Sequence, residues 1–123
     1  MLLCFAVEKC AVSPTGDRLY IITSYRPDML VTLARDGTLL ATYTDPALVS
    51  PRGLHVTPAG QVLVCGFLSN TVLQVGWEGE SKLATLATEE DGVRCPVSVC
   101  YSSTTSSIIV GQAGDNILVF RVE

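Results

Sequence analysis

The fold of this chain is decided by residues 51–66, which read Pro51-Arg52-Gly53-Leu54-His55-Val56-Thr57-Pro58-Ala59-Gly60-Gln61-Val62-Leu63-Val64-Cys65-Gly66. Two short apolar runs flank the segment Pro58-Ala59-Gly60. Proline fixes φ near −65° and glycine accepts a positive φ, so this segment is typical of a tight turn. Runs rich in Val and Leu between such turns favour strands. The stretch therefore predicts two strands joined by a turn.

The same layout recurs on both sides of this stretch. Upstream, residues 10–22 repeat it around the turn Pro14-Thr15-Gly16, and downstream residues 96–111 repeat its two apolar runs. Pro51 and Pro96 lie 45 positions apart. A period of roughly 40–45 residues with four short strands per unit is typical of a β-propeller blade.

The strands expected in each repeat are four at most. They are Cys10–Val12, Leu19–Ile22, Leu30–Leu33 and Leu39–Tyr43, then Leu54–Val56, Val62–Cys65, Val72–Val75 and Leu83–Leu86, then Val97–Tyr101, Ile108–Val110 and Ile117–Phe120. Asp36-Gly37 and Glu78-Gly79 are hairpin signals between third and fourth strands. No window shows a sustained helical period, so little helix is expected. The fold class predicted is all-β, with about three four-stranded antiparallel blades forming half of a six-bladed ring.

The chain divides at the repeats into one propeller segment over 1–123. It comprises a strand over 2–7, blades over 8–50 and 51–95, and a partial blade over 96–123. Three blades are too few to close a ring. Two alternatives follow: two chains close a six-bladed ring, with the strand over 2–7 completing the partner's last blade, or the chain is the C-terminal half of a longer propeller.

Bulk composition argues against several classes of protein. The chain has 123 residues, of which 48% are hydrophobic and 16% are charged, and this excludes a disordered chain. No apolar run approaches the roughly 18 residues that span a membrane. Residues 2–7 are apolar but are followed directly by Glu8-Lys9, which is not the pattern of a secretory signal. The net charge of −4 argues against a large phosphate-binding surface.

The five cysteines are interpreted as apolar filler. Cys10, Cys65 and Cys100 fall on expected strands, and the other repeats carry Leu54 and Val99 at the position of Cys10 and Ile22 and Val110 at the position of Cys65. The spacing of Cys95 and Cys100 lacks the second pair and the histidine that a zinc site needs. A reducing compartment, and hence a cytoplasmic location, follows as the expectation.

The second repeat carries a recognisable family pattern. It consists of Pro51-x-Gly53-Leu54-x-Val56-x-Pro58-x-Gly60-x-Val62-Leu63-Val64, then Asn70-Thr71-Val72-Leu73-Gln74-Val75, then Glu78-Gly79. With this pattern the chain resembles NHL-repeat β-propellers, and more narrowly the C-terminal NHL repeats of tripartite-motif proteins. The resemblance covers Cys10 to Val122. It implies a six-bladed ring that recognises a protein or, in some relatives, single-stranded RNA. The RING finger and B-box of tripartite-motif proteins have no counterpart in this sequence.

Signals for catalysis are thin. His55 is the single histidine and aligns with Ala11 and Cys100, which favours a structural role. The sequence contains no Gly-x-Ser-x-Gly, His-Glu-x-x-His or P-loop motif. Glu89-Glu90-Asp91 lacks the alternating oxygen ligands of a calcium loop and reads as a solvated connection. We therefore expect no enzyme activity, no cofactor and no metal site, and a metal-dependent propeller enzyme is the least favoured alternative.

Binding is better supported. In a propeller, the connections between second and third strands share a rim with the connections between blades, and loops on a rigid scaffold commonly carry function. The candidate binding residues on that rim are Tyr25, Arg26, Arg52, Phe67, Asn70, Arg94, Gln112 and Asp115. The leading prediction is a non-catalytic module that binds a protein or peptide, with Phe67 as its main anchor. The alternative is single-stranded RNA, held by the rim arginines and aromatic stacking.

Overall fold

The structure is a computed structural model that describes residues 7–24, 27–114 and 116–122. It is all-β, as the sequence predicts, with a 3-10 turn η1 (Glu89–Asp91) as the only helical segment among the described residues. The strands are β1 (Val7–Val12), β2 (Arg18–Thr23), β3 (Met29–Ala34), β4 (Leu39–Tyr43), β5 (Pro51–Val56), β6 (Val62–Gly66), β7 (Thr71–Val75), β8 (Lys82–Ala87), β9 (Pro96–Ser102), β10 (Ser107–Gln112) and β11 (Ile117–Arg121).

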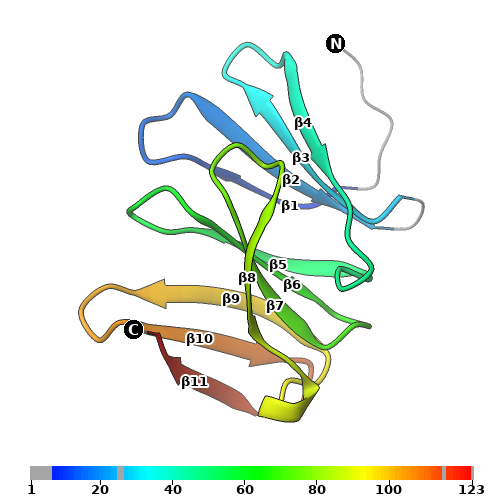
Figure 1. The fold of residues 1–123 in the computed structure, drawn as a ribbon, viewed down its shortest axis with the longest axis vertical. Coiled ribbons are helices and arrows are strands. Elements are labelled where there is room, and N and C mark those ends of the chain that lie inside the picture. Colours follow the sequence, from blue (N-terminus) through cyan, green and yellow to red (C-terminus); the bar gives the residue numbers. More distant parts are fainter. Residues whose placement is uncertain (1–6, 25–26, 115, 123) are drawn as a thin grey trace.

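The strands form three antiparallel sheets with the order expected of propeller blades. Blade 1 is β1-β2-β3-β4, blade 2 is β5-β6-β7-β8, and blade 3 has β9, β10 and β11. The three sheets lie face against face, one after another along the chain (Figure 1). β5 contacts both β1 and β9, so the first strands of the blades form the shared inner edge.

The first strand of each blade begins earlier than predicted. β1 starts at Val7, β5 at Pro51 and β9 at Pro96. Proline is tolerated at the first position of a strand, where its missing N–H is not needed by the ladder. Gly53 also lies inside β5, because a Cβ there would come within 2.9 Å of the Ser98 Cα of the next blade. Glycine at position 53 therefore allows blades 2 and 3 to approach each other closely.

The additional strand predicted over residues 2–7 falls mostly outside the described residues. Val7, its last residue, belongs to β1 and pairs with Thr23 of β2. The described part of the chain places no fourth strand beside β11.

The core lies between the blades. Blade 1 meets blade 2 through Tyr20, Ile22, Leu30, Tyr43 and Leu48 on one side and Val62, Val64, Leu73 and Val75 on the other. Blade 2 meets blade 3 through Leu63, Cys65, Val72, Ala87 and Val93 on one side and Val99, Ile108 and Val110 on the other. Alternate residues of β6 therefore enter different clusters, because successive side chains of a strand point to opposite faces. Burial on both faces explains why β6 is apolar without alternation.

The prediction that the strand cysteines are buried apolar residues is confirmed for one of the three. Cys65 is fully buried, and burial raises the pKa of its thiol to about 11. Cys10 and Cys100 are exposed, so they fill no interior space. They lie on the inner strands β1 and β9. The residue type found at the equivalent position of another repeat does not determine whether a side chain on these strands is buried. All four described cysteines are free thiols.

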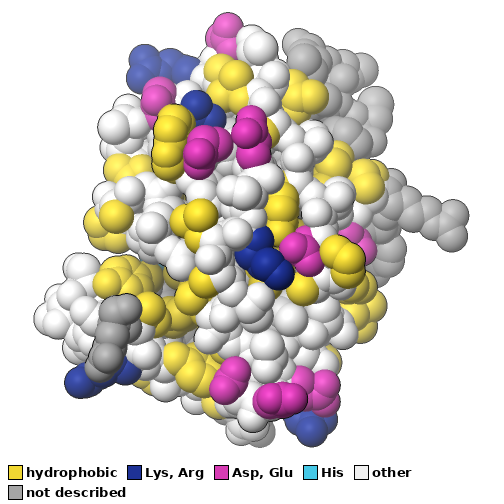
Figure 2. All heavy atoms as spheres, viewed as in Figure 1, with side chains coloured by type: hydrophobic (Ala, Val, Ile, Leu, Met, Phe, Trp, Pro, Cys, Tyr) yellow, Lys and Arg dark blue, Asp and Glu magenta, His cyan; other side chains and the backbone are white. Residues whose placement is uncertain are grey.

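The surface carries mixed charge. Figure 2 shows acidic and basic side chains in small neighbouring groups, separated by neutral and apolar ones. None of the helical segments in the described ranges is long and apolar enough to cross a membrane.

Candidate functional site

The blades present two rims, formed by opposite ends of the strands. The predicted rim, where the sequence places its candidate residues, is made by the β6–β7 and β10–β11 turns and by the connections over 44–50 and 88–95. The opposite rim is made by the turns over 13–17, 57–61, 76–81 and 103–106.

Arg52 and Phe67 come together on the predicted rim. The Arg52 Cζ lies 4.4 Å from the centroid of the Phe67 ring, a cation–π contact. Both side chains are half-buried, and the Phe67 N–H donates to the Ser50 carbonyl at 2.9 Å. The Arg52 Nε is buried without a hydrogen-bond partner among the described residues. The two predicted binding residues therefore stack on each other, with Arg52 over one face of the Phe67 ring.

Asn70, Arg94 and Gln112 join the connections of the predicted rim. The Asn70 Oδ1 accepts a hydrogen bond from the Cys95 N–H at 2.9 Å, and the Gln112 Oε1 accepts one from the Arg94 N–H at 2.5 Å. The exposed Arg94 guanidinium lies 3.9 Å from a Glu89 carboxylate oxygen. The two amide side chains thus hold two turns against the 88–95 connection.

Three candidate residues, Tyr25, Arg26 and Asp115, lie outside the described residues. The other five lie on one rim, and side-chain atoms of Asn70, Arg94 and Gln112 make polar contacts within the chain.

The opposite rim carries an aromatic group that the sequence reasoning did not single out. Trp77 stands in the β7–β8 turn with 53% of its surface exposed. The Arg18 Cζ of blade 1 lies 4.4 Å from its ring centroid, and the Tyr20 hydroxyl donates to its carbonyl oxygen at 2.7 Å. Burial raises the pKa of Tyr20. The available signal was the single tryptophan of the chain inside a glycine-flanked turn, Gly76-Trp77-Glu78-Gly79.

A hollow of about 230 Å³ lies beside Trp77 at the junction of blades 1 and 2, and we call it the 1–2 hollow. Pro14, Arg18, Tyr20, Pro58 and Trp77 form much of its wall. Its carboxylate, Asp17, accepts hydrogen bonds from the hydroxyls of Thr15 at 2.5 Å and Ser13 at 2.9 Å. These hydroxyls, Thr15 first, lower the pKa of Asp17.

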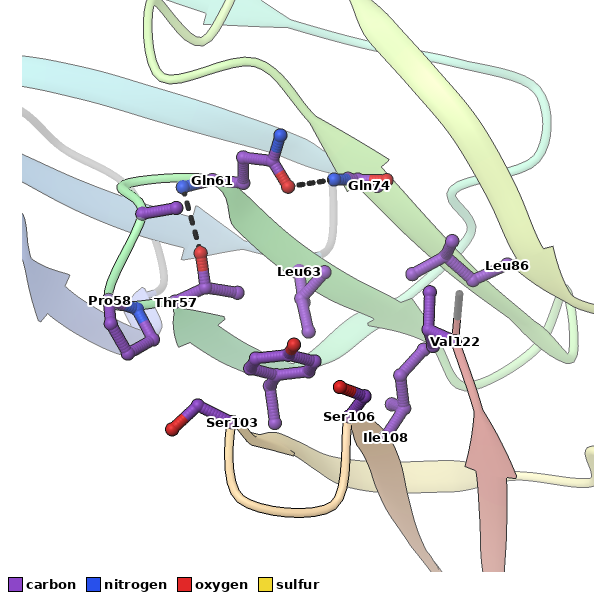
Figure 3. Close-up of a pocket in the computed structure, with 12 residues that line it drawn as sticks. Thr57, Pro58, Gln61, Leu63, Gln74, Leu86, Ser103, Ser106, Ile108 and Val122 are labelled. Carbon is purple, nitrogen blue, oxygen red and sulfur yellow. Dashed lines mark hydrogen bonds between the residues drawn. The ribbon is translucent and has the colours of Figure 1, made fainter.

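A second hollow, of about 430 Å³, lies at the junction of blades 2 and 3, and we call it the 2–3 hollow (Figure 3). Blade 2 contributes Thr57, Pro58, Ala59, Gln61, Leu63, Gln74 and Leu86, and blade 3 contributes Tyr101, Ser103, Ser106, Ile108 and Val122. The Gln74 side-chain amide donates to the Gln61 side-chain carbonyl, and the Gln61 N–H donates to the Thr57 hydroxyl at 3.1 Å. Pro58 and Ala59 also line the 1–2 hollow, so the two hollows flank one turn.

Side chains that could bind a metal are dispersed in the described part of the chain. In residues 7–24, 27–114 and 116–122, no three His, Cys, Asp or Glu side chains are grouped as a metal site requires. His55 lies half-buried in β5, and its Nε2 is buried without a partner in the described structure. Burial lowers the pKa of His55. The Asp91 carboxylate accepts the Thr88 N–H at 2.9 Å and caps η1.

No protein-family model matches the chain, and no curated protein sequence matches it. Among solved structures, it is similar to Kuenenia stuttgartiensis hydrazine synthase, with a TM-score of 0.75 and 17% identity over 98% of this chain and 34% of that one. It is also similar to a chain of the nidogen/laminin complex, with a TM-score of 0.74 and 19% identity over 94% of this chain and 48% of that one. The shared property is the fold. The chain spans about a third and about half of these two neighbours.

Proposed function

We propose that the chain is a non-catalytic, NHL-type propeller module that recognises a protein or peptide partner, and that the partner binds on the opposite rim. The Arg18–Trp77 stack carries this proposal. Trp, Tyr and Arg are the residue types most enriched among the energetic hot spots of protein interfaces. Trp77 is exposed, yet Arg18 stacks on its ring and the Tyr20 hydroxyl holds its backbone carbonyl, so the stack restricts the ring before a partner covers it and less side-chain entropy is lost on binding.

The surroundings of the stack support the same proposal. The 1–2 hollow beside Trp77 has an apolar wall of proline and alanine, against which a partner side chain can be desolvated.

The free thiols of the described cysteines support the cytoplasmic location expected from the sequence.

The RNA alternative receives less support. Arg52 is stacked on Phe67, and Arg94 is paired with Glu89. The face in Figure 2 mixes acidic with basic groups, and the net charge is −4. RNA affinity depends mostly on unpaired basic groups along the backbone of the nucleic acid.

The test is a selection of a random-peptide library on the immobilised chain, followed by calorimetric titration of the enriched peptides. Trp77→Ala and Arg18→Ala should each weaken binding by about tenfold or more. Phe67→Ala, on the predicted rim, is the matched control and should leave the affinity unchanged. Loss of binding in Phe67→Ala alone would move the site to the predicted rim. A labelled single-stranded RNA that binds with a steep salt dependence, with no peptide enriched, would overturn the proposal.

A further inference from the structure

The two hollows occupy equivalent places in successive blade junctions. By the register of the strand pairs, Tyr20 of blade 1 and Leu63 of blade 2 hold the same position. Trp77 and Val122 are 45 positions apart, which is the repeat period, and each follows the third strand of its blade. The 1–2 hollow is lined by Tyr20 and Trp77, and the 2–3 hollow by Leu63 and Val122.

The 2–3 hollow is therefore not a necessary product of packing two blades. At the first junction the Tyr20 ring is fully buried and its hydroxyl is bonded to Trp77. At the second junction the smaller aliphatic side chains of Leu63 and Val122 stand in place of the Tyr20 and Trp77 rings. Blade 3 fills part of the space that these smaller side chains leave, because it has Tyr101 at the position where blade 2 has Val56. The remaining space is still about 430 Å³, against about 230 Å³ at the first junction.

The chemistry of the 2–3 hollow restricts what can occupy it. Among the described residues, no Asp, Glu, Lys, Arg or His lines it, so an ionic group buried against these residues would lose hydration without gaining an opposite charge. Leu63, Leu86, Ile108 and Val122 supply apolar contact, and the Tyr101 ring supplies an aromatic neighbour. Hydroxyl and amide groups from Gln61, Ser103 and Ser106 surround this apolar part (Figure 3). Its size falls in the range of ligand pockets, about 300–1,000 Å³.

We propose that the 2–3 hollow binds a neutral aromatic side chain, tyrosine or phenylalanine, supplied by the protein or peptide partner. The incoming ring takes the place that Tyr20 fills from within the chain at the other junction. The neutral walls admit its phenol or phenyl group and exclude acidic and basic side chains. This inference rests on the proposed binding function and adds the identity of the side chain recognised.

The test titrates amino-acid amides, as probes of single side chains, into the full chain. Binding is measured as changes in the amide chemical shifts in ¹H–¹⁵N NMR spectra. The probes are N-acetyl-tyrosinamide and N-acetyl-phenylalaninamide, with N-acetyl-leucinamide as the apolar control and the N-acetyl amides of glutamate and lysine as charged controls. The aromatic probes should shift the side-chain amides of Gln61 and Gln74 and the backbone amides of Ser103 and Ser106, with millimolar affinity. The leucine probe should bind about tenfold more weakly.

Two variants close the hollow in the way the first junction does. Leu63→Tyr should fill it from blade 2, and Val122→Trp should cover it as Trp77 covers its own junction. Each should abolish the shifts while an unchanged dispersed spectrum reports an intact fold. Leu63→Met, which conserves volume, is the control and should keep them. Val122 follows the last strand, so its variant remains informative if Leu63→Tyr fails to fold.

The outcomes separate this inference from the proposed function. Trp77→Ala should lose the selected peptides yet keep the probe shifts at Gln61 and Ser106. Absence of shifts in the parent chain, equal binding of the leucine probe, or shifts that persist in Val122→Trp would each overturn the aromatic assignment. In each of these cases, loss of peptide binding in Trp77→Ala would still support the proposed binding function.

Discussion

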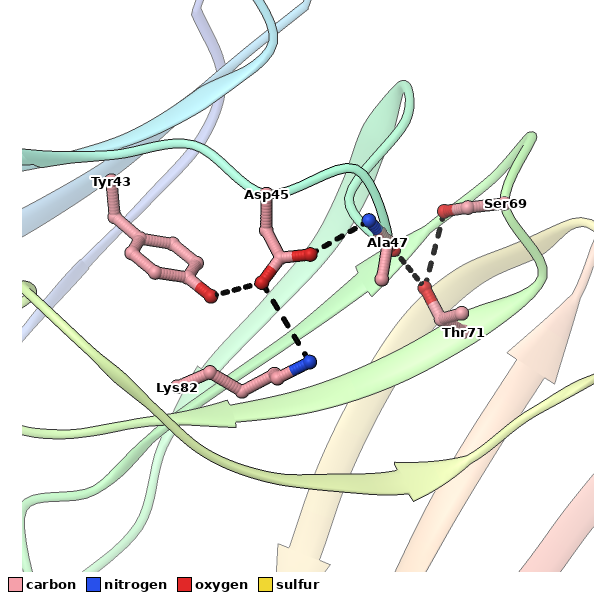
Figure 4. Close-up of polar contacts among 6 residues, drawn as sticks. All are labelled: Tyr43, Asp45, Ala47, Ser69, Thr71 and Lys82. Atoms are coloured by element: carbon pink, nitrogen blue, oxygen red, sulfur yellow. Dashed lines mark hydrogen bonds and ion pairs between the residues drawn. The ribbon is translucent and has the colours of Figure 1, made fainter.

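At the scale of single residues, Asp45 shows how one carboxylate fastens two blades (Figure 4). Its side chain accepts the Tyr43 hydroxyl at 2.5 Å and the Ala47 N–H at 2.8 Å, and the Lys82 Nζ lies 3.7 Å away. The Thr71 hydroxyl donates to the Ala47 carbonyl at 2.5 Å and extends the network to β7. The Tyr43 hydroxyl, followed by the Ala47 amide, lowers the pKa of Asp45. Burial and Asp45 raise that of Tyr43.

Asp45→Asn should therefore destabilise the protein in a pH-dependent way. A carboxylate whose pKa is lower in the folded state stabilises fully above its unfolded pKa, near 3.8, and loses this contribution as pH falls through the folded pKa. We expect a loss of about 1–3 kcal/mol at pH 7 that shrinks toward pH 3, measured by urea unfolding with Trp77 fluorescence.

Asp36→Asn is the matched control, because Asp36 is an exposed turn carboxylate that accepts hydrogen bonds from Thr38 of its own hairpin. Its effect should be smaller at pH 7. A gap between Asp45→Asn and the parent that does not change with pH would contradict the assignment.

Gly79 and Gly37 test a contact between blades at equivalent hairpin turns. Both have a positive φ, 75° and 92°, so alanine costs about 1–2 kcal/mol at either position. At Gly79 a Cβ would also overlap the Thr32 hydroxyl of blade 1, whereas at Gly37 nothing lies within 4 Å. Gly79→Ala should therefore lower the melting temperature more than Gly37→Ala does. Equal shifts in thermal unfolding would show that Thr32 gives way at no cost.

At the scale of elements, the free face of blade 3 is unlike the equivalent face of blade 2. Val72 is fully buried against blade 3, but Ile117, at the equivalent place in β11, is 71% exposed, and Val119 is 64% exposed. Exposed apolar residues in a row on a sheet favour association with another sheet.

Replacing Ile117 and Val119 together by Lys should weaken self-association, because two charges would have to be buried at the contact. Sedimentation velocity across a concentration series measures the effect, with little change expected in the far-UV circular dichroism spectrum. Leu68→Lys, at a turn residue that is also 64% exposed, is the control and should behave like the parent. Unchanged association in the double variant would show that this face is not the contact.

At the scale of the whole molecule, the three blades leave two outer faces without a neighbouring blade in the described structure. On the side of blade 1 away from blade 2, Met29, Val31 and Leu33 form a separate cluster, and all three side chains are buried. A propeller avoids such faces by closing into a ring. We expect light scattering after size exclusion to give a dimer near twice 13.1 kDa, the mass of a ring closed by two chains. A stable monomer with a cooperative melt would contradict the need for closure, and a heterogeneous assembly would favour a segment of a longer propeller.

The sequence by itself determined the blades. The repeats that begin at Pro51 and Pro96 show the same turn residues and strand lengths at the same spacing. Such local signals are enough to place each antiparallel hairpin. They also suffice to gather Phe67, Asn70, Arg94 and Gln112 on one rim, because strand direction follows from strand count.

Only the tertiary structure revealed the two hollows on the opposite rim. The 2–3 hollow depends on the difference between Leu63 and Tyr20, and on Tyr101 reaching across from the next blade. These side chains meet through packing between sheets, a non-local contact that no period along the chain encodes. The same holds for Trp77, whose stack with Arg18 joins residues 59 positions apart. It holds for Cys10 and Cys100 too, because exposure is decided by what packs on a strand and not by the strand itself.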